Sequence, residues 1–105
     1  MPNEAIYISA DNLVSWEGMV NESTDEYIND AVVTFTLKTA AGVAVTGASA
    51  ISMTYQTASD GNYHGILEST VTLTADARYY MEITATSGGT IVGFRRWAVV
   101  ARYDA

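Results

Sequence analysis

The residues closest to a chemical site are four carboxylates in the first third of the chain, Glu22, Asp25, Glu26 and Asp30. Carboxylate oxygens bind calcium in irregular geometry, and a pair of carboxylates can act as the acid and base of a glycosidase. Their spacing is not that of an EF-hand loop, and a solvated acidic loop explains the same residues. We therefore predict no metal site and no catalytic residue here.

The single histidine, His64, lies in an alternating segment that turns it away from the side of Tyr63 and Leu67. A lone exposed histidine cannot build a histidine-rich metal site, and it is seldom a catalytic base. The chain has no nucleophile elbow, P-loop or dinucleotide-binding glycine pattern, and no cysteine for thiol chemistry. We expect a protein that is not an enzyme and needs no cofactor.

Aromatic side chains are the better candidates for binding. Five of them are exposed or of undecided orientation in the pattern: Tyr7, Trp16, Tyr27, Tyr80 and Trp97. Such side chains can anchor a protein interface or stack on sugars, or they can close the edges of the core. Binding to protein is the leading interpretation, and a carbohydrate-binding or adhesion module that contacts a host surface stays as the alternative.

Composition limits the kind of molecule that must position these residues. The 105 residues are 49% hydrophobic and 16% charged, which predicts one packed domain over residues 1–105 that needs no disulfide. The net charge of −7 predicts no binding to nucleic acid. The start of the chain lacks the pattern of an export signal, and the longest apolar run, Trp97–Ala101, is far too short for a membrane span. We expect no export and no membrane partner.

Charge is unevenly distributed along the chain. Residues 1–30, an expected strand and acidic loop, hold seven acidic residues and no lysine or arginine, whereas four of the five basic residues are Arg78, Arg95, Arg96 and Arg102. One hypothesis is that the acidic segment meets the arginines of the last strand, within one molecule or head to tail between copies. The candidate interaction residues are therefore Trp16, Glu22, Asp25, Glu26, Tyr27, Arg95, Arg96 and Trp97.

Alternation with a period of two recurs along the chain, which predicts an all-β fold. The clearest strand is 31–38, and Leu13, Val14 and Trp16 could continue a first strand begun at 6–8. Residues 18–29 are expected to form a long loop, and residues 59–62 form the strongest turn signal. Turns between short strands are typical of a β-sandwich with residues 31–105 as its body.

The segment Val71–Ala85 predicts a strand, a corner and a second strand that begins near Tyr79. Leu73 and Tyr79 have the spacing of the tyrosine corner of immunoglobulin-like and fibronectin type III domains, in which the tyrosine hydroxyl binds backbone across the turn. We therefore expect an antiparallel β-sandwich of about seven strands.

The last strand, 90–103, contains a conflict of parity. Val92 and Phe94 lie on one parity, and Trp97 and Val99 on the other. A β-bulge at Arg95 and Arg96 would reconcile them and leave both arginines facing solvent. The alternative is that Trp97 lies outside as a contact residue.

Three segments resemble the small immunoglobulin-like modules encoded among bacteriophage virion genes: GVAVTGASAISMTYQ, SDGNYHGILESTVTLTADARYYMEITA and the ending VVARYDA. In these modules a D-G-x-Y-x-G segment, here Asp60, Gly61, Tyr63 and Gly65, precedes the corner tyrosine. The resemblance covers about residues 30–103 and indicates fold better than function.

The resemblance implies a virion structural protein, made in a bacterial cytoplasm and assembled into a particle. Its expected place is capsid decoration or the head-to-tail neck, ahead of the tail. Its expected partners are capsid, neck or tail subunits and further copies of itself, bound through edge strands.

Overall fold

The computed structural model describes residues 4–21 and 23–103. The predicted all-β fold is confirmed, and within these residues no helix is present that could cross a membrane. The strands are β1 (Glu4–Ile8), β2 (Asn12–Trp16), β3 (Val20–Asn21), β4 (Glu26–Tyr27), β5 (Val32–Thr39), β6 (Ile51–Tyr55), β7 (Tyr63–Leu67), β8 (Arg78–Ser87) and β9 (Thr90–Tyr103).

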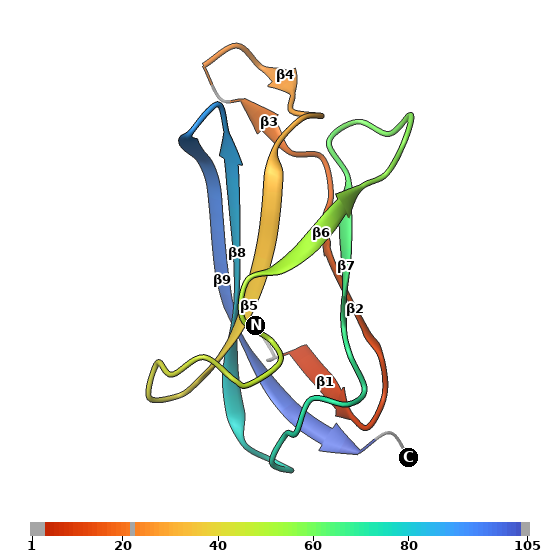
Figure 1. Cartoon of the computed structure of the whole chain (residues 1–105), viewed down its shortest axis with the longest axis vertical. Coiled ribbons are helices and arrows are strands. Elements are labelled where there is room, and N and C mark those ends of the chain that lie inside the picture. The colour runs from red at the N-terminus through yellow and green to blue at the C-terminus, as the bar shows by residue number, and fades with distance from the viewer. Residues whose placement is uncertain (1–3, 22, 104–105) are drawn as a thin grey trace.

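Seven strands form one sheet in the order β1-β9-β8-β5-β6-β7-β2, and β3 and β4 form a separate hairpin. The expectation of a purely antiparallel sheet is wrong at one edge, because β1 runs parallel to β9. The sheet folds over on itself through β6, which crosses diagonally in Figure 1. Ile51–Met53 pair with β5, whereas Thr54 and Tyr55 pair with β7.

The core lies between the two layers that this fold creates. On β5, Val33, Phe35 and Leu37 are buried, and they stand opposite the buried Ala85, Ile83 and Met81 of β8. The alternation predicted for residues 31–38 is therefore confirmed, and it exists because one face of β5 must leave water. The outward positions of the same strands are mostly polar.

The tyrosine hydroxyl acts as predicted, but the strand before it does not form. Tyr79 is buried, and its hydroxyl accepts a hydrogen bond of 2.9 Å from the backbone N–H of Thr74. Leu73 is half-buried and packs against the core. Residues 71–77 form turns and irregular backbone, since β7 ends at Leu67.

The predicted bulge at Arg95 and Arg96 is wrong. Both arginines are in regular register with β8, opposite Ile83 and Glu82, and the register shifts at Val92 instead. Trp97 consequently stays on the inward side, half-buried against the core. The parity conflict resolves because Phe94 is on the outer side, with 55% of its surface exposed.

The N-terminal segment also differs from expectation. The chain turns at Ser9, whose φ is +59°, so residues 6–8 and 12–16 form two strands rather than one. β1 joins β9 at one edge of the sheet, and β2 joins β7 at the other. The expected loop at 18–29 contains the β3–β4 hairpin.

Candidate functional site

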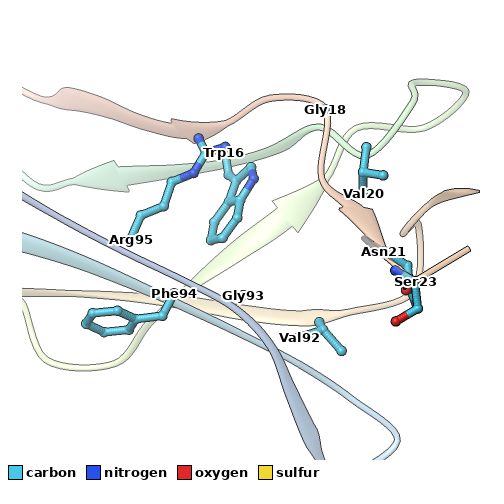
Figure 2. A pocket seen from close by; sticks show the side chains of 9 residues that line it. All are labelled: Trp16, Gly18, Val20, Asn21, Ser23, Val92, Gly93, Phe94 and Arg95. Carbon is cyan, nitrogen blue, oxygen red and sulfur yellow. Dashed lines mark hydrogen bonds between the residues drawn. The ribbon is translucent and has the colours of Figure 1, made fainter. Parts of the chain in front are cut away.

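A groove lies where the inner sides of β2 and β9 meet, beside the β3–β4 hairpin (Figure 2). Its volume is about 640 Å³. It is lined by Trp16, Gly18, Val20, Asn21, Ser23, Val92, Gly93, Phe94 and Arg95. We call it the edge groove, because β2 is the last strand of the sheet and half of β9 has a neighbour on one side alone.

Trp16 and Arg95 form the wall of the edge groove. The register with Ile83 turns Arg95 inward, and its guanidinium carbon lies 4.1 Å from the centroid of the Trp16 ring. This is the geometry of a cation–π contact, and it covers one face of the indole. The orientation of Trp16, which the sequence left undecided, is inward, because 7% of its surface reaches solvent. It offers no free platform for a sugar.

Gly93 allows the indole to lie directly on the backbone of β9. A Cβ atom at this position would come within 2.5 Å of Cη2 of Trp16, far closer than atoms in contact can approach. Gly93 pairs with Ala85 in the ladder, so both strands carry small residues where the ring packs. The groove thus depends on the absence of a side chain at residue 93.

Two buried indole N–H groups lack an acceptor in the described part of the chain, those of Trp16 and Trp97. Trp97 lines a second pocket of about 290 Å³ between β1, β2 and β9, and Arg95 lies at the rim of both pockets. A buried donor without an acceptor costs about 1–3 kcal/mol. Within the described residues, the buried side-chain groups that lack a hydrogen bond are therefore gathered where β2 meets β9.

The edge of β9 beside the groove is open. β1 pairs with Val99–Tyr103, and within the described residues Thr90–Ala98 has β8 as its sole neighbouring strand. Nine residues of extended chain present about 30 Å of edge. Ile91 and Phe94, on the outer side of this stretch, are 67% and 55% exposed. Unpaired N–H and C=O groups on such an edge can bind another strand.

Arg96 lies on the opposite side of β9 from Arg95. Its guanidinium stacks over Tyr80 at 4.0 Å and binds Glu82, with Nε and Oε2 3.2 Å apart. Lys38 binds the other oxygen of Glu82 at 3.0 Å. The two arginines were expected to act together, but adjacent residues of a strand point to opposite faces. They belong to two different surfaces.

Asp25, Glu26 and Tyr27 are exposed on the β3–β4 hairpin, and Glu22 lies outside the described residues. The hairpin is held at its base by two buried residues, Met19 and Ile28. The N–H of Met19 donates to the carbonyl of Gly61 at 2.8 Å. Gly61 has φ +72° and lies so close that a Cβ would clash with the Met19 backbone. The hairpin is thus a fixed projection.

The structure therefore places Arg95 beside Trp16 in the edge groove and beside Trp97 in the second pocket, whereas Asp25, Glu26 and Tyr27 line neither. Among described residues, no ion pair joins an acidic residue of 1–30 to an arginine, and Glu17 pairs instead with His64 at 3.1 Å. The hypothesis of an intramolecular contact between them is not supported within that part. Sequence reasoning missed Gly93 and Phe94, although regular alternation back from Trp97 and Val99 would have placed Phe94 outside.

In the described part of the chain, no three His, Asp or Glu side chains lie close enough together to hold a metal ion. Among the described residues, the one clear pKa shift belongs to Tyr63, whose burial raises the pKa of its phenol above the ordinary 10.0. Its hydroxyl donates to the Ile28 carbonyl at 2.8 Å and accepts from the Ala31 N–H at 3.1 Å. This tyrosine is structural.

No protein-family model matches the chain. No curated protein and no solved structure is significantly similar to it.

Proposed function

We propose that this chain is a non-enzymatic structural protein of a bacteriophage virion, most suited to capsid decoration or to the head-to-tail neck. The resemblance of residues 30–103 to virion-encoded immunoglobulin-like modules is the reason for choosing a virion. Under this proposal its partners are capsid, neck or tail subunits, and it acts through protein contacts alone.

The observation that carries a role in protein contacts is the open edge of β9. A long edge strand with exposed apolar residues is a liability unless it is paired, covered or charged. The bulge at Val92 and the inward Arg95 are two devices that discourage pairing with an arbitrary strand. A specific partner strand with an acceptor for Arg95 would overcome both, so this edge favours selective over promiscuous binding.

The finer fold assignment is also part of the proposal. We infer an immunoglobulin-like sandwich of the fibronectin type III kind, with β2 and β7 in one layer and β5, β8 and β9 in the other. Support comes from β6, which changes layers, from the parallel β1–β9 pair and from the Tyr79 hydrogen bond. A fold of this kind presents exposed strand edges to a partner and does not enclose a cleft.

The test begins with the genome that encodes the chain. A position beside capsid, portal or tail genes is expected, and particles purified from that source by density gradient should contain the protein at a fixed copy number. Quantitative mass spectrometry measures that number. A protein that stays wholly in the soluble fraction, with none in the particles, would overturn the proposal.

A glycan array separates the adhesion alternative. We expect no binding above background, because the exposed face of Trp16 is covered by Arg95. Glycan binding that is lost in Trp16→Ala or Trp97→Ala would replace the structural role by adhesion. Loss in an exposed control, Tyr103→Ala, would instead indicate a nonspecific effect.

A further inference from the structure

Most of the positive charge of this acidic protein lies on one surface. The outward positions of β5, β8 and β9 carry four of the five basic residues, Lys38, Arg78, Arg96 and Arg102, and one acidic residue, Glu82. Their net charge is +3 on a protein of −7. We call this surface the basic face.

The assignment of these residues to one face follows from the ladder. Lys38 stands opposite Tyr80 and Arg78 opposite Val100, whereas the neighbours Tyr79, Val99 and Ala101 are buried on the other side. Arg102 pairs with Tyr7 of β1, which is 40% exposed. Residues paired across a ladder share a face, so this charge pattern is a property of the sheet.

Two of the four cations form no ion pair with another described residue. Glu82 is shared by Lys38 and Arg96, and in the described part of the chain neither Arg78 nor Arg102 forms an ion pair. The same face carries apolar side chains, with Val32 and Ile91 69% and 67% exposed and Phe94 beside them. A face with surplus cations and exposed apolar surface fits an acidic protein partner.

The rest of the chain has the charge of an acidic protein partner. Outside these positions the sequence holds one basic residue, Arg95, and eleven acidic ones. The β3–β4 hairpin offers exposed Asp25 and Glu26 beside Tyr27, and Asp30 follows it. Aromatic and acidic side chains together complement a basic and apolar face.

We propose that the basic face of one copy docks the β3–β4 hairpin of a second copy. Within one molecule, shape separates the hairpin from Lys38, Arg78 and Arg102. The hairpin lies at one end of the longest dimension, 42 Å, whereas β5 and β9 end and β8 begins at the other (Figure 1). A contact between two different surfaces is heterologous, so it repeats head to tail and builds a ring or a filament. It rests on the proposed function, since many copies in an assembly are what a virion protein provides.

The loops at the end of the molecule opposite the hairpin restrict how two copies can meet. Asp11, Glu68 and Asp76 lie in connections outside the sheet positions of the basic face. They would repel an acidic hairpin that approached the end of the molecule. The hairpin must therefore approach the basic face itself, where Glu82 is the one described carboxylate.

The first experiment measures self-association of the purified chain by sedimentation velocity. We expect concentration-dependent association that weakens by at least about tenfold between about 0.05 M and about 0.5 M salt, because exposed charge pairs are screened. A chain that remains monomeric at low salt and high concentration would overturn the inference. It would leave the proposed function standing, since that depends on detection in particles.

Charge exchange identifies the two surfaces. One variant combines Arg78→Glu with Arg102→Glu, which leaves the Lys38–Glu82–Arg96 network intact. The other combines Asp25→Asn, Glu26→Lys and Asp30→Lys, with asparagine at residue 25 because its φ is +63°. Each variant alone should associate at least about tenfold more weakly, and their equimolar mixture should recover association. Near-wild-type thermal unfolding confirms that each is folded.

The control variant is Glu17→Lys, which reverses an exposed charge that pairs with His64 and belongs to neither surface. Its association should lie within about twofold of the unchanged chain, because a single exposed ion pair outside the contact contributes little. Failure of the mixture to recover association would show that the hairpin is not the occupant. Tight binding of a DNA or RNA oligonucleotide that is lost with Arg78→Glu/Arg102→Glu would assign the face to nucleic acid and overturn the inference.

Discussion

At the residue scale, two tyrosines use their hydroxyl groups to hold backbone that lies outside the strands. The hydroxyl of Tyr79 accepts a hydrogen bond from the N–H of Thr74. The hydroxyl of Tyr63, on β7, forms hydrogen bonds with the backbone of Ile28 and Ala31. Both rings are buried, with 6% and 0% of their surfaces exposed. Each ring therefore contributes core packing, and each hydroxyl fixes backbone that no strand holds.

Replacement of Tyr79 by phenylalanine tests the corner. The ring stays buried and one hydrogen bond is lost, so we expect destabilisation of about 0.5–1.5 kcal/mol in urea unfolding. Thr74 is exposed, so water can satisfy its N–H, and a larger loss is not expected. Tyr103→Phe is the matched control, because Tyr103 is 67% exposed. Equal stability of both variants would mean that the Tyr79 hydroxyl contributes nothing.

Tyr63 predicts how stability depends on pH. Burial raises the pKa of its phenol above 10.0, so the folded protein keeps a proton that the unfolded chain loses. This contribution is fully present below pH 10 and falls as the pH rises through the raised value. We expect a steeper alkaline loss of stability in the unchanged chain than in Tyr63→Phe, measured by urea unfolding between about pH 9 and 12. Parallel profiles would contradict it.

At the element scale, the contact of β2 with β9 depends on Gly93. The variant Gly93→Ala should lose about 1–3 kcal/mol, because the new Cβ would lie 2.5 Å from the Trp16 ring. A smaller ring should relieve the clash, so Gly93→Ala should cost less in a Trp16→Phe background than in the unchanged chain. A double-mutant cycle measures this coupling, and strictly additive losses would show that the ring and residue 93 are not in contact.

Hydrogen exchange tests whether the first half of β9 is an open edge. In dilute protein at high salt, we expect about every second amide of Thr90–Ala98 to exchange fast, because antiparallel pairing with β8 uses alternate amides. Val99–Tyr103 should be better protected, since β1 covers that stretch. Uniform protection along β9 would show that the edge is covered. Exchange read by NMR resolves the individual amides.

At the scale of the whole molecule, the fold separates charge by face although the sequence separates it by position. Arg78, Arg96 and Arg102 occupy outward positions of β8 and β9, so all three lie on one side of the sheet, while Arg95 lies on the other. Two copies that met through their acidic surfaces would repel each other, so a contact between copies is favoured only where it includes the basic face. The same pattern thus limits how copies can meet.

The sequence by itself determined the all-β class, the faces of β5 and β8 and the role of Tyr79. These follow from alternation and turn chemistry, which act between residues close in the chain. It could not determine that β1 and β2 lie at opposite edges of the sheet, or that the bulge is at Val92 rather than at Arg95. Both depend on which distant strand supplies the hydrogen bonds.

The candidate site shows the same division. Trp16 and Trp97 were chosen from the sequence as aromatic residues of exposed or undecided orientation, and Arg95 as a charged residue. The position of Arg95 between the edge groove of Trp16 and the second pocket of Trp97 is a result of strand register. One residue of register moves a side chain to the other face of a sheet. The tertiary structure alone decided that Arg95 covers Trp16 while Arg96 joins the basic face, because pairing over long sequence distances fixes that register.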